Sequence, residues 1–232
     1  MEDLTRLGKR IVFLGKGVFL SLLGMAVLFG LINGFFGNPV LMGNDAMSMS
    51  VGLITLLLLL LLSIFVLLVF CLVGGISVLV WTFRVTKNLR TKAKTVLSPW
   101  VSVIGLIIWY VNIFVQFGIF RNLTHVQEKL LKDAGATVKP VPLKMLTGWF
   151  VTSLVSLVVS YNSSSAVCVM AGIILAAASV IFFLKAFEPF IAQHSLLFKL
   201  EQEAILRKKV DEVIREREIE KLASEVQQAK FE

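Results

Sequence analysis

Apolar residues are concentrated in five long runs that are separated by shorter polar connectors. The runs cover residues 18–36, 52–83, 99–120, 145–161 and 166–184. A helix that crosses a bilayer needs about 20 predominantly apolar residues, with a lower limit of about 17. Four of the runs approach or exceed this length, and the run 145–161 lies near the lower limit. The pattern therefore predicts an all-α integral membrane protein.

Turn signals and one proline divide the chain further. The runs 145–161 and 166–184 flank a short polar turn without charge, so we expect a helical hairpin there. Proline removes a backbone donor and clashes with the preceding turn, so Glu188-Pro189 is expected to interrupt the last helix. The chain then becomes polar. We divide it into a membrane domain, residues 1–198, and a charged helix, residues 199–232.

Composition supports the assignment to a bilayer. The chain of 232 residues is 57% hydrophobic and 16% charged, with a mean hydropathy of +0.86, whereas a soluble domain carries about 25% charged residues. Its two cysteines, Cys71 and Cys168, each fall within an apolar run. Two thiols cannot build a disulfide framework or a four-ligand zinc site, so we expect both to serve in packing.

The distribution of basic residues decides the expected topology, because cytoplasmic loops are enriched in Lys and Arg. If all five runs crossed the bilayer, basic segments would lie outside in either orientation. If the run 99–120 enters and leaves by the same face, all 23 Lys and Arg residues lie on the cytoplasmic side. We therefore expect four transmembrane helices plus one re-entrant or interfacial helical segment, with a C-terminal cytoplasmic helix. Five transmembrane helices are the alternative.

The run 99–120 contains the candidate site residues Asn112 and Gln116. Non-helical backbone at membrane depth must be buried in protein or line a water-filled cavity, and these amides suit either a break in the helix or a pore wall. The alternative is ordinary hydrogen bonding between crossing helices. Ser98-Pro99 is a good helix start for this run, since serine caps a helix and proline fits its first position.

Two further groups of residues are candidates for structural roles. Small residues spaced by four let helices approach closely, which makes Gly30 with Gly34 and Gly172 with Ala176 candidate packing faces. The segment after the second run is strongly basic, and its side chains are candidates for the membrane interface: Arg84, Lys87, Arg90, Lys92 and Lys94.

Catalytic and metal-binding patterns are absent from the sequence. Gly15-Lys16 lacks the glycine and the Ser or Thr of a phosphate-binding loop, and no G-x-S-x-G elbow occurs. The two histidines, His125 and His194, have no neighbouring ligand cluster and are expected at the surface or the membrane interface. No acidic residue lies inside an apolar run, so the usual signature of a proton relay is missing. We expect no enzyme activity, no cofactor and no metal.

The region around the second and third runs resembles an uncharacterised bacterial membrane family, domain of unknown function 4328. The matching features are Trp81-x-x-Arg84, Asn88-Leu89-Arg90, Ser98-Pro99, a tryptophan-containing apolar run, Gly148-Trp149 and a last span that ends near Gln193. The resemblance covers roughly residues 56–193. The family has no established activity, so the resemblance implies a bacterial membrane architecture and no chemistry.

These observations lead to two functional hypotheses. The first is a non-enzymatic assembly or interaction subunit, oligomeric or bound to other membrane proteins. The second is a small channel or transporter with a pore around the re-entrant segment. We expect the lipid bilayer as a partner and no nucleic acid, because no basic surface interleaved with aromatic residues is present. The expected location is the bacterial inner membrane with both termini cytoplasmic.

Overall fold

The computed structural model describes residues 2–37, 46–107, 112–137, 139–161 and 165–228, and these are helical almost throughout. Six helices follow one another: α1 (Thr5–Gly37), α2 (Ala46–Arg90), α3 (Pro99–Ile107), α4 (Asn112–Asp133), α5 (Leu143–Tyr161) and α6 (Ala166–Gln228). No strand occurs within the described residues. The all-α prediction is confirmed.

Four of these helices, α1, α2, α5 and α6, are long and apolar enough to cross a membrane. They correspond to the first, second, fourth and fifth apolar runs of the sequence. At about 1.5 Å per residue, the 45 residues of α2 are longer than a hydrocarbon core of about 30 Å requires. The four expected helices that are long and apolar enough to span a bilayer are therefore present, as a membrane protein requires.

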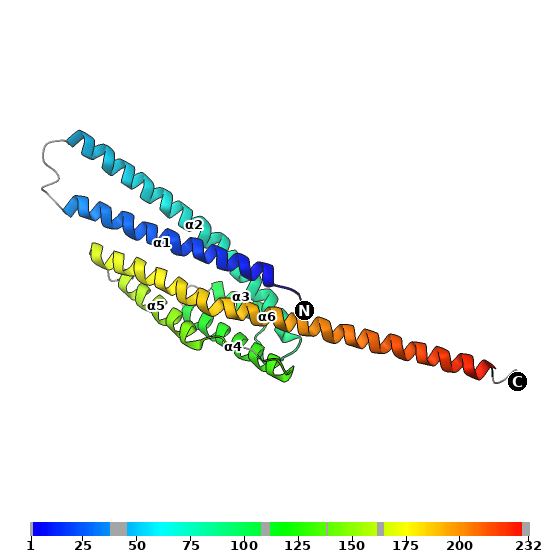
Figure 1. The fold of residues 1–232 in the computed structure, drawn as a ribbon. Helices are drawn as coiled ribbons and strands as arrows, with labels where there is room; N and C mark the ends of the chain where they lie inside the picture. The colour runs from blue at the N-terminus through cyan, green and yellow to red at the C-terminus, as the bar shows by residue number, and fades with distance from the viewer. Residues whose placement is uncertain (1, 38–45, 108–111, 138, 162–164, 229–232) are drawn as a thin grey trace.

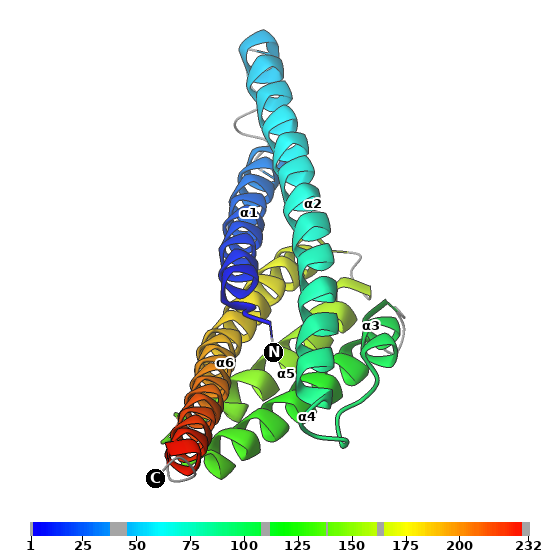
Figure 2. The ribbon, with the colours of Figure 1, turned by 90° about the vertical axis from the view of Figure 1, so that its right-hand side faces the viewer.

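The long helices form two antiparallel pairs, α1 with α2 and α5 with α6 (Figure 1). α1 also packs against α6, so it joins the two pairs. α3 and α4 lie beside α2 and α5, and α6 continues past all of them towards the C-terminus (Figure 2). The predicted helical hairpin of the last two runs is therefore present as α5 and α6.

The third apolar run is not one helix. It is divided into α3, of nine residues, and α4. α3 begins at Pro99 as expected, and the amide of Ser102 donates to the Ser98 carbonyl at 3.0 Å. Trp100 of α3 contacts Phe83 near the end of α2, whereas Leu106 lines a cavity nearer the middle of α2. α4 then turns back, so α3 and α4 form a helical hairpin.

α4 extends well beyond the apolar run and includes the polar residues up to Asp133. Its end has a left-handed residue, Gly135, with φ of 73°. The Gly135 amide donates to the Lys132 carbonyl and the Ala136 amide to the Leu131 carbonyl, at 2.9 and 3.0 Å. This is the geometry of a glycine C-cap, which satisfies carbonyls that a helix end leaves unpaired.

One expectation about the last helix was wrong. α6 does not stop at Glu188-Pro189 but runs through Pro189 without interruption. The proline removes one backbone hydrogen bond at a cost of about 3 kcal/mol. The neighbouring turn is held by packing of Phe187 and Phe190 on Trp81, and by the Gln127 side chain, which donates to the Phe190 carbonyl at 2.9 Å.

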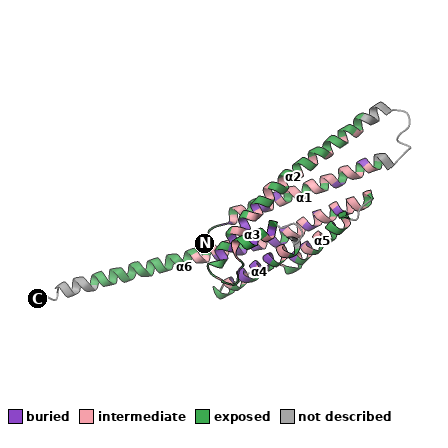
Figure 3. Ribbon diagram, turned by 180° about the vertical axis from the view of Figure 1, so that it is seen from behind, coloured by how far each residue is buried: buried purple, intermediate pink, exposed green. Residues whose placement is uncertain are grey.

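Burial is concentrated at the end of the helix bundle from which α6 projects (Figure 3). We call this the packed end; its buried residues come from segments 4–11, 81–96, 119–141, 146–149 and 186–197 and include Leu106 of α3. The opposite parts of α1 and α2, residues 20–34 and 51–72, are called the splayed end, because α2 diverges from α1 there and many of its large apolar side chains are exposed. His194 belongs to the packed end and is 1% exposed. The expectation that both histidines lie at the surface holds for His125 only.

Candidate functional site

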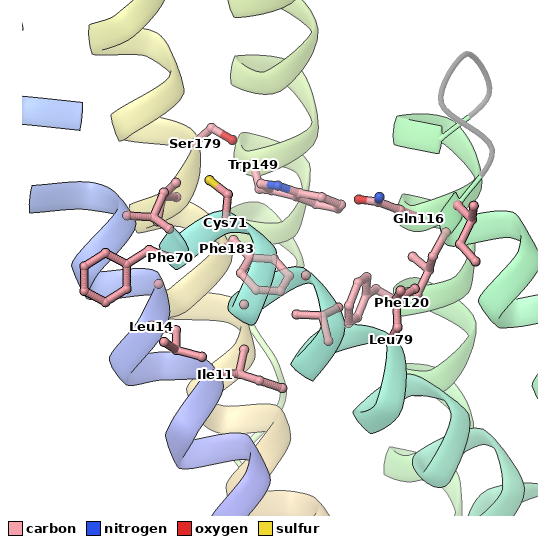
Figure 4. A pocket seen from close by; sticks show the side chains of 18 residues that line it. Ile11, Leu14, Phe70, Cys71, Leu79, Gln116, Phe120, Trp149, Ser179 and Phe183 are labelled. Carbon is pink, nitrogen blue, oxygen red and sulfur yellow. The ribbon is translucent and has the colours of Figure 1, made fainter. Parts of the chain in front are cut away.

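A cavity of about 540 Å³ lies where all six helices meet. α1 and α2 provide one wall through residues such as Leu14 and Phe70, and α5 and α6 provide the other through Trp149 and Phe183 (Figure 4). The tips of α3 and α4 close it with Leu106 and Gln116. The end of α3 and the start of α4 therefore lie beside the four long apolar helices.

An aromatic cluster forms the floor of this cavity. Phe120 contacts Trp149 and Phe183 with ring centroids 6.0 and 5.5 Å apart. Below them, Trp81 stands edge-on to Phe187 at 4.6 Å. Edge-to-face and offset contacts at these distances stabilise aromatic pairs beyond their area burial. The cluster joins α2, α4, α5 and α6 and forms the part of the packed end that borders the cavity.

Gln116, one of the two residues singled out in the sequence, lines the cavity. Its amide points towards the Trp149 ring in Figure 4. Asn112 is the first residue of α4, and its side chain lies outside the described part of the structure. The structure therefore brings Gln116 together with Trp149 and Ser179, a grouping that spacing along the chain does not reveal.

A second cavity of about 820 Å³ adjoins the first, because Ser179 and Val180 line both. Its wall contains several hydroxyl groups of α5 and α6: Ser153, Ser156, Ser160, Tyr161 and Ser179. The Ser153 and Ser179 hydroxyls are hydrogen-bonded at 2.6 Å, and Ser156 donates to the Gly172 carbonyl at 2.9 Å. These bonds link α5 to α6 within the bundle.

The candidate packing glycines occupy different environments. A Cβ at Gly172 would lie 2.6 Å from the Ser160 hydroxyl oxygen, so α5 and α6 approach closely there. Ala176 of α6 lines the second cavity. A Cβ at Gly30 would reach Met170 only at 3.7 Å, and one at Gly34 would meet nothing within 4 Å.

Among the glycines of α1, the least room for a side chain is found at three that we did not select from the sequence. A Cβ at Gly8 would lie 2.7 Å from Ile191, and one at Gly15 would lie 2.7 Å from Leu184. A Cβ at Gly17 would lie 2.6 Å from Phe70 of α2. Gly8 and Gly15 are seven residues apart, which returns them to the same face of a helix packed as in a coiled coil. That spacing is the signal that could have identified them.

The basic segment is exposed, and two of its members are paired. Arg84 forms an ion pair with Glu2 at 2.5 Å, and Lys92 pairs with Glu201 at 2.7 Å. Lys87 and Arg90 lie in the last turn of α2, where a positive charge interacts favourably with the helix dipole. Lys94 is exposed in the connector to α3. Lys16 and Glu188 form a looser pair at 3.9 Å between α1 and α6.

A buried amide network in the packed end was also missed. The Gln127 side chain is 0% exposed and donates to the Phe190 carbonyl and to the Gln193 side-chain oxygen, at 2.9 and 3.2 Å. Gln193 in turn donates to the Lys139 carbonyl at 2.8 Å. The network ties α4, the α4–α5 connector and α6 together. No sequence pattern marked it, because Gln127 lies in a segment that looks polar and exposed.

These walls can hold an apolar molecule but offer little to a charged one. The first cavity has no charged residue among the described residues that line it, and its polar groups are neutral. Within the described residues, no three His, Cys, Asp or Glu side chains are grouped so as to hold a metal ion.

Comparison of the chain with protein-family models, with curated proteins and with solved structures gave no match. The resemblance to domain of unknown function 4328 therefore stays a prediction.

Proposed function

We propose that this protein is a non-enzymatic subunit of a membrane assembly and that the projecting part of α6 makes the assembling contact. The observation that carries the proposal is the exposure of α6 beyond Glu201: every described side chain from residue 202 to 221 is exposed. A helix that is exposed all round needs a partner or many internal ion pairs to be stable in water.

The part of α6 from which the exposed segment extends is packed against the rest of the protein. Leu197 is buried in the packed end, and Glu201 pairs with Lys92 at 2.7 Å. The packed end thus supports the direction of a helix that extends about 30 Å further, at 1.5 Å per residue over residues 202–221. A rigid direction lowers the entropy cost of binding a partner.

We assign the partner as a second copy of this chain. Leu206, Val210 and Val213 are exposed apolar residues that share one face of α6. Residues 199–232 contain eight basic and nine acidic side chains, so two copies carry almost no net repulsion. Copies in one membrane would project the same helix from the same face and could lie side by side.

The proposed membrane arrangement follows the charge argument. α3 and α4 form a re-entrant hairpin, supported by Gly105 of α3, whose Cβ would lie 2.6 Å from Val115 of α4. Both termini are then cytoplasmic, and the chain resides in a bacterial inner membrane. A cysteine at Lys129 tested in intact cells checks this arrangement, since labelling from outside would contradict it.

The assembly proposal is tested by the oligomeric state of the full chain in lipid nanodiscs. Leu206→Glu with Val210→Glu and Val213→Glu should convert oligomers to monomers. Ala204→Glu, which lies about 160° from Leu206 around the helix, is the matched control and should leave the oligomers intact. Oligomers that persist in the triple variant would overturn the second copy as the partner.

A second proposal is a small channel or transporter, favoured by the position of Gln116 in a cavity between the long apolar helices. Its test is solute or ion flux through reconstituted liposomes. Flux that is lost in Asn112→Leu and Gln116→Leu would support a pore. Absence of flux through liposomes that contain the unaltered protein would exclude this second proposal.

A further inference from the structure

The first cavity reaches the surface of the bundle between α2 and α3. Three of its lining residues, Cys71 and Gly75 of α2 and Ile107 of α3, are exposed. The residues around them, Leu72, Ile76 and Ile104, are exposed and apolar. The opening is therefore bordered by apolar side chains, and one of its two helices, α2, is long and apolar enough to span a membrane.

The α2 backbone makes room for the cavity. Gly74 and Gly75 both line it and have no side chains to fill it. A Cβ at Gly75 would meet nothing within 4 Å, and one at Gly74 would meet only Leu14, at 3.8 Å. The space at Gly75 is therefore open, and a larger side chain could occupy it without displacing the backbone.

The interior suits an elongated apolar molecule. The volume of about 540 Å³ lies within the range of about 300–1,000 Å³ typical of ligand sites. Leu79, Phe120, Val180 and Phe183 contribute apolar walls. The second cavity, of about 820 Å³, lies on the other side of Ser179 and Val180, which line both cavities. An apolar cavity does not hold water well, and an empty one forfeits dispersion contacts along its lining.

We propose that this cavity binds one acyl chain of a bilayer glycerolipid, which enters between α2 and α3. In a bilayer, lipid acyl chains are the apolar groups next to the opening. A bound acyl chain restores the dispersion contacts that the empty space lacks. The neutral lining fits a hydrocarbon chain and leaves the charged headgroup outside. The bound lipid would join the two helix pairs, because its chain touches α1 and α2 on one side and α5 and α6 on the other.

The test uses the full chain in vesicles of phosphatidylcholine with a photoreactive diazirine on one acyl chain. After illumination, adducts are mapped by mass spectrometry. We expect adducts on the interior residues Phe120 and Trp149, which ordinary annular lipid does not reach. Gly75→Leu should lower them about fivefold by filling the space.

Gly52→Leu is the matched control, because it makes the same change on the same helix at a position where a Cβ also meets nothing within 4 Å. It should leave the interior adducts unchanged. Cys71→Phe fills the cavity from one turn earlier and provides a second test if Gly75→Leu does not fold. Interior residues without adducts, or adducts that persist in the folded filling variants, would overturn the proposal.

Discussion

The packed end and the splayed end differ in what covers their apolar side chains. In the packed end, Trp81, Val85 and Leu89 of α2 are at most 1% exposed and contact other helices. In the splayed end, the leucines of the same helix, such as Leu58 and Leu61, are more than 60% exposed. One helix therefore changes from a protein core to an open surface along its length.

The difference follows from the two surroundings of the chain. A lipid tail is as apolar as leucine, so a membrane helix gains little by burying leucine against protein. In the packed end, backbone and side-chain polar groups have partners within the protein, which include the side chains of Gln127, Gln193 and Asn88. We expect stability to depend on the packed end much more than on the splayed end.

Replacement of Trp81 gives the largest expected effect. Trp81→Ala removes a 1%-exposed side chain that contacts Phe120, Phe187 and Phe190, and should lower the free energy of unfolding by about 3–5 kcal/mol. Trp100→Ala is the control, because Trp100 is 67% exposed. Denaturant unfolding in mixed micelles measures the free energy of unfolding of both variants. Equal losses in the two variants would contradict the expected difference between buried and exposed positions.

The buried amide network should have the next largest effect. Gln127→Leu leaves the Gln193 side-chain oxygen without this donor and should cost about 1–3 kcal/mol. Gln202→Leu makes the same change at an exposed position of α6 and should be nearly neutral. A stable Gln127→Leu protein would show that the network does not hold the packed end together.

Glycine replacement in α1 sharpens the comparison within one helix. Gly8→Ala places a Cβ 2.7 Å from Ile191 and should cost about 1–3 kcal/mol by overpacking. Gly34→Ala meets no atom within 4 Å and should be neutral or stabilising by up to about 1 kcal/mol, since alanine favours a helix. Thermal unfolding followed by circular dichroism measures both variants. A melting temperature lowered to the same extent in both would contradict the expected difference between the two positions.

The smallest effect concerns pH at the start of α1. Hydrogen bonds from the Thr5 hydroxyl and amide lower the pKa of Asp3 below its ordinary value. Ionised Asp3 therefore stabilises the folded protein fully above its unfolded pKa of about 4. This stabilisation is lost as the pH falls through the lowered pKa of the folded state. Asp3→Asn should remove this acid dependence, measured by unfolding at several pH values. An unchanged pH profile would exclude Asp3 as its source.

Run lengths and hydropathy predicted five apolar runs, which include the four long helices and the hairpin of α5 and α6, and the pair Ser98-Pro99 predicted the start of α3. These features depend on local spacing and on the need of a bilayer for apolar residues, which a single sequence displays directly. Lys and Arg counts led us to expect an unusual third run, and that run is divided between α3 and α4.

Only the tertiary structure decided which residues meet. Pro189 stays within α6 because Trp81 and Gln127, distant in sequence, pack on the same turn. Gly8 and Gly15 matter more for close packing than the G-x-x-x-G pair, since Ile191 and Leu184 face them. The cavity beside Gln116 exists because all six helices leave space there. Hydropathy records what a residue prefers to contact, but the partner on another helix determines whether that contact is lipid, protein or an open cavity.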